Sequence, residues 1–172
     1  LPPFVFDVAT TQVAGNKLHL AKRVGADIEP SWIADTKGRP IQEPTKLPDE
    51  YMLLPFGGTR EQGSHKGYGF AATSEILSTI LSGMGPGFLM PPKPRTVMGH
   101  HVQAIKIDGF IDPDDFKKDM DKFLLGLINA KPAPNKDRVI YPGLTEYEEQ
   151  KIRKLKGIPY HSEVINWFES YK

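Results

Sequence analysis

Glycine and proline, present in sixteen copies each, divide this 172-residue chain into short segments. Proline lacks the amide hydrogen that a helix interior needs, and glycine loses more backbone freedom on folding than other residues. The first two-thirds of the chain are therefore expected to form strands and loops around one central helix. The last third is expected to be mostly helical. We place the boundary at Gly109, between residues 1–108 and residues 109–172.

The order of apolar and turn-forming residues predicts a mixed α/β fold. Strands are expected at residues 4–8 and 97–107, where β-prone or alternating apolar residues occur. Helices are expected at residues 13–24, 66–81, 113–128, 145–156 and 162–171, from apolar spacing or from capping patterns. The helix at 66–81 is predicted to have a wide buried face, made of Phe70, Ile76, Leu77, Ile80 and Leu81.

Side chains that can cap a helix are found where three of these helices should begin. Asp112 stands before Pro113, which suits the first position of a helix. Thr145 and Glu148 have the spacing of a capping box, and Ser162 stands at the start of the last helix. These residues predict the three helix starts.

Composition and charge favour a soluble globular protein of the cytoplasm. The formal net charge is +1, without the basic excess that nucleic-acid binding favours. No apolar run approaches the roughly 18 residues that suggest a membrane span. Cysteine is absent, which excludes disulfides and thiolate metal sites. His100 and His101 would face opposite sides of a strand, so no shared metal site is expected.

The segment GSHKGYGFAATSEIL at residues 63–77 contains the dinucleotide pattern G-x-G-x-x-A, at Gly67, Gly69 and Ala72. A Rossmann fold requires an apolar strand directly before this pattern and an acidic residue about 20 positions after it. Here a polar loop precedes the pattern, and apolar residues stand where the acidic residue is required, about 20 positions after it. A P-loop is excluded as well, because Gly63 is followed by Ser64 where that motif has lysine.

A helix that begins in this glycine-rich segment could nevertheless bind an anion. Its first amide groups and its dipole favour negative charge, and Lys66 and His65 add donors beside them. The equally weighted alternative is that Gly67 and Gly69 only allow the helix to pack closely. Asp7, in the predicted first strand, is expected to be buried, where it would fix a loop or accept a hydrogen bond from a ribose hydroxyl.

Four segments carry a family resemblance: FVFDVATT (4–11), LLPFGGTREQGSHKGYGFA (53–71), GHHVQAIKID (99–108), and RVIYPGLTEYE (138–148) followed by KGIP (156–159). In this order they resemble the C-terminal half of the malate/L-lactate dehydrogenase family, which includes ureidoglycolate, sulfolactate and diketogulonate enzymes. The resemblance covers nearly the whole chain. It implies a sulfolactate-dehydrogenase-like fold with a non-Rossmann NAD(P)-binding domain and a C-terminal helical segment.

The resemblance also implies which residues hold the coenzyme, NAD or NADP. By motif these are Val5, Phe6, Asp7, Val8, Ala9, Thr10, Thr11, His65, Lys66, Gly143, Leu144 and Thr145. The family commonly has a glutamate directly after the Pro-Gly pair, where this chain has Leu144. Contacts made through the backbone could survive that change.

The family's catalytic histidine belongs to an upstream S-H-G segment that this sequence lacks, so no catalytic residue is assigned here. Because the chain starts abruptly at Leu1, we expect a processed product, a fragment or a natural subunit. Its partner would be the missing N-terminal half or a separate chain carrying it, in a homodimer, and the C-terminal helical segment would pack on that half.

Two functions remain open at this point, beside a purely structural fragment whose glycine motif serves only packing. The first is an oxidoreductase that interconverts a small 2-hydroxy acid and its 2-oxo acid, with this chain as the coenzyme-binding half. The second is a non-catalytic nucleotide- or phosphate-binding module, or an assembly subunit. The substrate acid, and the choice between NAD and NADP, are left undecided by the sequence.

Overall fold

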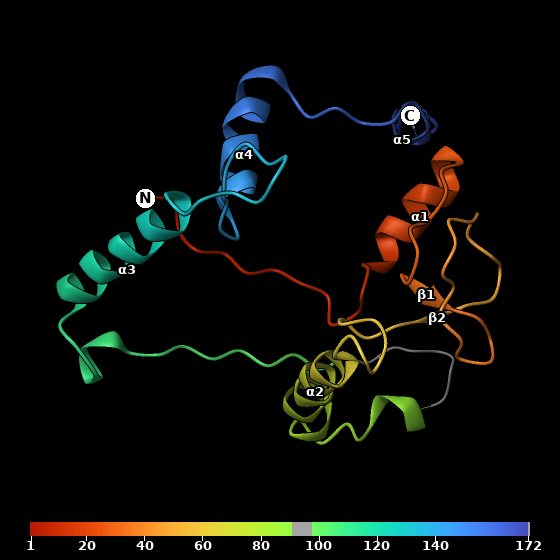
Figure 1. The fold of residues 1–172 in the computed structure, drawn as a ribbon, viewed down its shortest axis with the longest axis horizontal. Coiled ribbons are helices and arrows are strands. Elements are labelled where there is room, and N and C mark those ends of the chain that lie inside the picture. Colours follow the sequence, from red (N-terminus) through yellow and green to blue (C-terminus); the bar gives the residue numbers. More distant parts are fainter. Residues whose placement is uncertain (91–97, 172) are drawn as a thin grey trace. The chain divides into compact units, whose positions relative to one another are not determined.

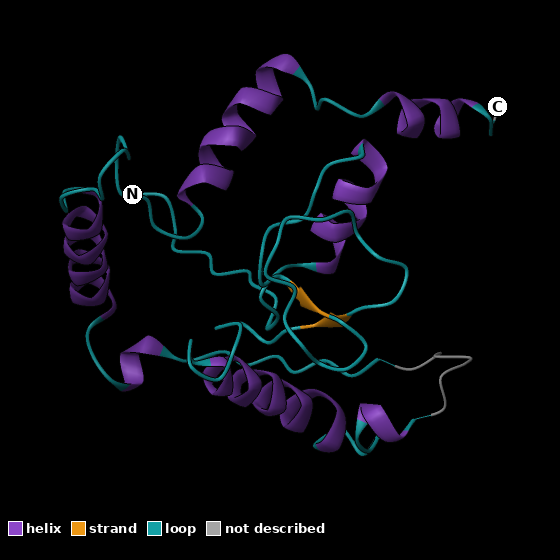
Figure 2. Cartoon of the chain, turned by 45° about the vertical axis from the view of Figure 1, so that its right-hand side comes forward, coloured by secondary structure: helices purple, strands orange, loops and turns teal. Residues whose placement is uncertain are grey.

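The computed structural model describes residues 1–90 and 98–171. The chain divides into two compact units, and each is described by itself. The central unit contains Val8–Ala104, and the terminal unit combines Leu1–Asp7 with Ile105–Lys172. Helices joined by long irregular segments form most of both units (Figure 1 and Figure 2). The boundary that we place at Gly109 stays a prediction.

The central unit begins with helix α1, Gly15–Val24. The helix ends at Gly25, whose φ of +67° is the left-handed conformation that glycine adopts without steric penalty. The Gly25 amide donates to the carbonyl of Lys22, which satisfies one of the last free carbonyls of the helix. The helix predicted at residues 13–24 is thereby confirmed, starting two residues later.

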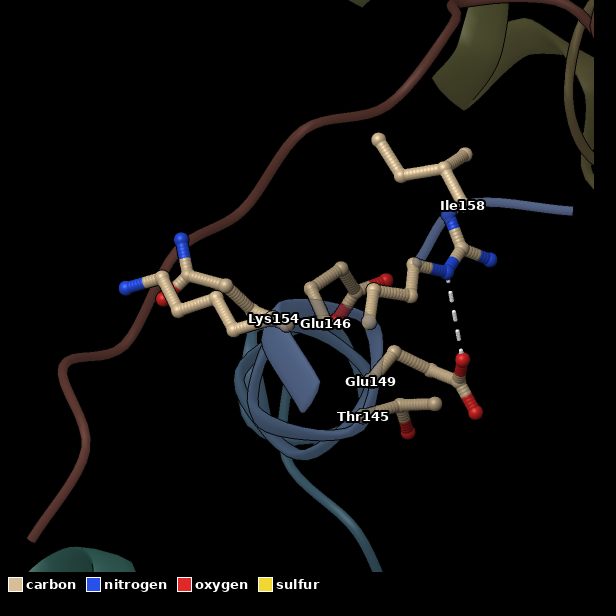
Figure 3. Close-up of a pocket in the computed structure, with 7 residues that line it drawn as sticks. Thr145, Glu146, Glu149, Lys154 and Ile158 are labelled. Carbon is tan, nitrogen blue, oxygen red and sulfur yellow. Dashed lines mark ion pairs between the residues drawn. The ribbon is translucent and has the colours of Figure 1, made fainter. Parts of the chain in front are cut away.

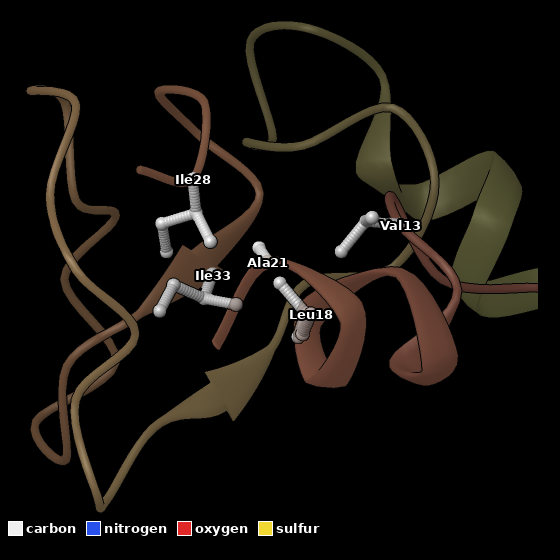
Figure 4. Packing of buried hydrophobic residues seen from close by; sticks show 5 residues of the cluster. All are labelled: Val13, Leu18, Ala21, Ile28 and Ile33. Atoms are coloured by element: carbon white, nitrogen blue, oxygen red, sulfur yellow. The ribbon is translucent and has the colours of Figure 1, made fainter. Parts of the chain in front are cut away.

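Two short antiparallel strands lie beside α1, namely β1 (Ile33–Ala34) and β2 (Met52–Leu53). Together with α1 they surround the core of the central unit, in which five side chains point toward one another (Figure 4): Val13, Leu18, Ala21, Ile28 and Ile33. Leu18 and Ile33 are completely buried, with exposed fractions of 0%. The core is partly covered by Trp32, Ile41, Leu47 and Tyr51.

Helix α2, Ser64–Glu75, continues directly into the π-helical segment η1, Ile76–Ile80. The amide of Leu81 donates to the carbonyl of Ile76, five residues earlier, at 2.8 Å. The helix predicted at residues 66–81 is therefore confirmed, with its last part wound as a π-helix. After it comes the short 3-10 helix η2, Gly87–Leu89.

The buried face predicted for this helix is wrong for most of its residues within the central unit. Phe70 is 64% exposed and Leu81 is 68% exposed, and Ile76 and Ile80 are also exposed. The spacing of apolar residues identifies the apolar side of a helix, but that side is buried only when a second element packs against it. No such element covers these four side chains within residues 8–90 and 98–104.

The terminal unit contains the 3-10 helix η3 (Ile107–Gly109) and helix α3 (Pro113–Ile128). The Asp112 carboxylate caps α3, since it accepts hydrogen bonds from the amides of Asp114 at 2.9 Å and Asp115 at 3.2 Å. This cap was predicted from the sequence and is confirmed. A carboxylate at this end also interacts favourably with the helix dipole.

Helices α4 (Leu144–Lys156) and α5 (Ser162–Glu169) complete the terminal unit, and the caps predicted for both are wrong. Gly143 occupies the position before α4, so Thr145 lies inside the helix and forms no capping box. The Nδ1 atom of His161 accepts from the amide of Glu163, which makes His161 the cap of α5 in place of Ser162.

A second core ties α3 to the start of α4. It consists of three buried side chains, Leu124, Tyr141 and Leu144, with Met120, Leu127 and Ile128 packed against them. Burial of Leu144 explains why α4 begins at this residue, because moving the helix start would expose its side chain to water.

The two predicted strands are wrong in the described residues. Residues 4–8 and 98–106 belong to no strand, and Val97 lies outside the described residues. A strand needs a neighbouring strand to form a ladder of hydrogen bonds, and alternation of apolar residues does not supply one. The amide of Val5 makes a single backbone hydrogen bond, to the carbonyl of Pro142 at 3.0 Å.

Replacing Leu18 with alanine should lower the free energy of unfolding by about 2–5 kcal/mol, because it leaves a cavity in the closed core of the central unit. Leu20 on the same helix is 55% exposed, so Leu20→Ala should change that free energy by less than about 0.5 kcal/mol. Urea titration of both variants measures the difference. Equal effects would contradict the assignment of the core.

Candidate functional site

The start of α2 has no side-chain cap, and His65 and Lys66 in its first turn are exposed, whereas Gly63 before it is buried. Gly63 stands before the helix with a φ of +98°, and no side chain accepts from the first amides. Two of these amides bond locally, Ser64 to the carbonyl of Thr59 and Lys66 to the carbonyl of Gly63, both at 2.9 Å. The N-terminal end of α2 therefore retains the positive field of the helix dipole, and no acidic residue lies in its first turn.

Lys66 adds a positive charge at the same place. Its side chain bends back over the helix start, so that Nζ lies 3.6 Å from where a Cβ on Gly63 would be. Lys66 is exposed, and within the part of the chain that the structure describes no carboxylate pairs with it. His65 beside it is exposed as well. Both predicted residues thus lie where an anion could approach.

The two glycines of the G-x-G-x-x-A pattern lie inside α2, after its first turn, and they differ in their surroundings. Gly67 is buried, and a Cβ there would overlap the backbone of Phe56. Gly69 has nothing within 4 Å of its Cβ position. Close packing explains Gly67, and in the turn before it the amides of Ser64 and Lys66 already donate to carbonyls.

Thr10 and Thr11 lie beside the loop that leads into α2. The carbonyl of Thr10 accepts from the amide of Phe56 at 3.0 Å, and Thr11 forms an isolated bridge with Pro55. The Thr11 hydroxyl donates to the carbonyl of Val13 at 2.7 Å. The central unit thus brings the predicted threonine pair to the segment that carries His65 and Lys66. Val8 and Ala9 precede this pair and are exposed.

In the terminal unit, the predicted residues Val5 and Gly143 are in contact. The amide of Val5 donates to Pro142, and a Cβ on Gly143 would lie 2.9 Å from the Cβ of Val5. Gly143 has a φ of +94°, so both its conformation and its surroundings exclude a side chain. Leu144 is buried in the core, whereas Thr145 is exposed.

Asp7 and its neighbour Phe6 have different surroundings from those expected. Asp7 is exposed, which corrects the expectation of a buried carboxylate in a strand. Phe6 is 68% exposed and lies close to Phe4, with 6.4 Å between ring centroids. The reason is that residues 4–8 form no strand, so no sheet covers them. Both side chains are therefore accessible.

Thr145 borders a hollow of about 650 Å³ along α4 (Figure 3), together with Glu146, Glu149, Gln150, Arg153, Lys154 and Ile158. Arg153 and Glu149 form an ion pair of 3.3 Å on its surface, at the i,i+4 spacing of neighbours on one helix face. The predicted residue Thr145 thus lies at one edge of an open, charged surface.

Sequence reasoning missed an ion pair across the turn before α4. The guanidinium of Arg138 donates from Nη1 to Oε1 of Glu148 at 2.8 Å, and from Nη2 to Oε2. This bond lowers the pKa of the Glu148 carboxyl below its ordinary value of 4.5. The two residues are ten positions apart, and no spacing rule connects such positions when a turn lies between them. Arg138 therefore gave no signal by itself.

The adjacent histidines line another hollow, of about 380 Å³, with Ser74, Leu77, Ser78 and Gly99. His100 and His101 both have exposed side chains. Among residues 1–90 and 98–171, no group of three or more histidine, aspartate or glutamate side chains could hold a metal ion. In the same residues, no helix has the length and apolar character needed to cross a membrane.

Gly67→Ala should lower the free energy of unfolding by about 1–3 kcal/mol, because the added methyl group overlaps the Phe56 backbone. Gly69→Ala places the same group in open space and should be neutral, or stabilising by up to about 1 kcal/mol through helix propensity. Denaturant unfolding compares this matched pair. Tolerance of alanine at Gly67 would show that close packing does not explain this glycine.

Comparison with known proteins supports a family relation along the whole chain. The family model described as malate/L-lactate dehydrogenase matches residues 1–169. Malate dehydrogenase of Pyrococcus abyssi is 30% identical over 167 residues, which cover 95% of this chain and 46% of that protein. L-sulfolactate dehydrogenase of Methanocaldococcus jannaschii is also 30% identical over 167 residues, which cover 95% of this chain and 46% of that protein.

Solved structures show the same relation. Malate dehydrogenase from Entamoeba histolytica superimposes with a TM-score of 0.87 at 29% identity, covering 98% of this chain and 49% of that chain. The sulfolactate dehydrogenase from M. jannaschii gives 0.76 at 31% identity, covering 95% of this chain and 46% of that one. These matches confirm the predicted sulfolactate-dehydrogenase-like, mixed α/β fold. The chain spans about half the length of these relatives, and it belongs to the malate/L-lactate dehydrogenase family.

Proposed function

We propose that the protein carrying this chain is an NAD(P)-dependent oxidoreductase that interconverts a small 2-hydroxy acid and its 2-oxo acid. The observation that carries this proposal is the family match over residues 1–169. Relatives matched over most of the chain are named for malate, L-lactate and L-sulfolactate. These three compounds are all small 2-hydroxy acids, which defines the substrate class that we propose.

The start of α2 is the proposed binding site for the coenzyme diphosphate. A diphosphate needs hydrogen-bond donors and positive charge, and an uncapped helix start beside a lysine offers both. The 3.6 Å approach of the Lys66 ammonium to the Gly63 Cβ position puts this charge beside the residue that precedes the helix. The residues present therefore fit an anionic group, and His65 adds a further donor at the exposed rim.

The remaining predicted residues are proposed as coenzyme contacts with less specific roles. Those of the central unit are Val8, Ala9, Thr10 and Thr11, and those of the terminal unit are Val5, Phe6, Asp7, Gly143, Leu144 and Thr145. Leu144 is buried, so it could contact a ligand only through its backbone. Asp7 is accessible and could accept a hydrogen bond from a ribose hydroxyl.

Hydride transfer would be supplied by the nicotinamide of the bound coenzyme. In this chain, the contribution of Lys66 and the α2 amides is to bind and orient that coenzyme through its phosphates. We assign no proton donor to the substrate carbonyl among the residues of this chain. A histidine carried by another part of the protein or by a partner chain is proposed for that role.

Lys66→Ala should weaken binding of NADH or NADPH roughly 10- to 100-fold, because it removes a charge-assisted contact to phosphate. Lys22→Ala is the control, since Lys22 is an exposed lysine of the same unit that pairs with Asp49 at 3.0 Å. Fluorescence titration of the full-length protein gives both affinities. Equal affinity of the Lys66 variant and the wild type would remove Lys66 from the site.

Turnover tests the enzyme proposal directly. The full-length protein should oxidise NADH or NADPH with at least one of the 2-oxo acids that correspond to malate, lactate and sulfolactate. Coenzyme binding without turnover on this panel, in a folded protein supplied with any partner chain, would favour a non-catalytic binding module. Absence of saturable coenzyme binding would refute the oxidoreductase and the nucleotide-binding module, and it would favour a purely structural role.

A further inference from the structure

We propose that Arg138 and Glu148 are positioning residues, whose ion pair holds the Pro142–Gly143 turn and the start of α4 in the conformation that receives the coenzyme. The inference rests on the proposed contacts of Gly143–Thr145 with that coenzyme. Neither side chain needs to touch the coenzyme itself. The role follows from what the pair connects.

The pair makes two contacts, and it closes a loop of the chain. Arg138 donates from both terminal nitrogens to the two oxygens of Glu148, which fixes the relative orientation of the planar groups as well as their separation. Arg138 precedes the turn and Glu148 lies on α4. In the described residues, the two hydrogen bonds of this pair are the side-chain hydrogen bonds that join the segment 131–140 to α4.

The turn between the paired residues is anchored on its other side by Tyr141. The Tyr141 ring is 2% exposed, and its hydroxyl donates to the carbonyl of Pro2 at 2.8 Å. The amide of Val5 donates to Pro142 at 3.0 Å. The turn is therefore held between the segment Leu1–Asp7 and α4, and two of the proposed coenzyme segments meet at it.

Gly143 makes this turn sensitive to small displacements. With a φ of +94° and the Cβ of Val5 beside it, this residue has little room to move toward the segment Leu1–Asp7. Its carbonyl accepts from the amide of Tyr147 at 3.1 Å, which begins the hydrogen bonding of α4. A shift of Arg138 relative to α4 would be transmitted through the turn to the first amides of the helix.

The exposure of both side chains indicates that the pair orients the turn and contributes little to the stability of the fold. The side chains of Arg138 and Glu148 are 54% and 36% exposed, and ion pairs at such places contribute little to the free energy of unfolding. A two-point contact can still restrict the orientation of a turn, since both groups are planar and directional. Loss of the pair should therefore affect coenzyme affinity more than melting temperature.

The chain provides a matched control on the same helix. Glu149 and Arg153 form an ion pair with similar exposure, 49% and 50%, at 3.3 Å. Both belong to α4, so this pair does not connect the helix to the turn. Glu149→Gln changes the charge of α4 by the same amount as Glu148→Gln, and it leaves the contacts between the helix and the turn in place.

The experiment uses the full-length protein with Arg138→Met, Glu148→Gln, both changes together, and the exchanged pair Arg138→Glu with Glu148→Arg. The control variants are Arg153→Met and Glu149→Gln. We expect each single change at the pair to raise the Kd and KM for the coenzyme about 5- to 20-fold, a range typical of coupled neighbours. The kcat at saturating coenzyme should stay within about twofold, because the reacting groups are untouched.

The double change should weaken binding no more than either single change, because both remove the same interaction. The exchanged pair should recover most of the affinity, and the control variants should bind as the wild type does. Hydrogen exchange of the amides at residues 143–147 should be faster in Glu148→Gln and unchanged in Glu149→Gln. This measurement needs no coenzyme and remains informative if Arg138→Met does not fold.

Normal coenzyme affinity with a lowered melting temperature would overturn the proposal, since the pair would then be structural only. A fall in kcat without a change in Kd would overturn it as well. Unchanged exchange at residues 143–147 would show that the pair does not hold the turn. A wild-type protein that binds neither NADH nor NADPH, with faster exchange in Glu148→Gln, would instead identify the proposed function as the part that fails.

Discussion

Left-handed glycines before two helices determine how this chain presents its helix starts. Gly63 precedes α2 with a φ of +98°, and Gly143 precedes α4 with a φ of +94°. A side chain is strained in this conformation, so glycine occupies the capping position. Glycine has no side-chain oxygen, and it cannot accept hydrogen bonds from the first amides as serine or aspartate would. Both helices consequently begin with amides that no side chain caps. The positive φ of these glycines thus accounts for the uncapped helix starts, and one of them is the proposed binding site for the coenzyme diphosphate.

The two helix starts are supported in different ways. At α2, the Lys66 side chain covers Gly63, while Gly67 packs against Phe56 and fixes the helix on the loop before it. At α4, Leu144 is buried and the Arg138–Glu148 pair spans the turn. The first arrangement leaves a positive, accessible end that suits an anion. The second leaves a neutral turn whose position is set by packing and by one ion pair.

Much of the apolar surface of the described chain is open to water. Phe88 and Phe110 are 83% and 84% exposed, and the apolar side of α2 and η1 is largely uncovered. Exposed side chains of this size are unfavourable in water, so covered positions are expected for them in an assembled protein. The chain also spans about half the length of its relatives. The sequence therefore identifies the apolar side of α2 and η1, whereas most of that side is exposed in the described residues.

The sequence by itself determined those features whose causes are local. Asp112 and Pro113 specify the start of α3, Gly25 and Gly157 mark the ends of α1 and α4, and the quoted motifs identify the family. Only the tertiary structure decided that residues 4–8 and 98–106 form no strand in the described chain, that Gly67 is a packing residue, and that Arg138 meets Glu148. These outcomes depend on contacts between residues far apart in the sequence, and no local propensity contains that information.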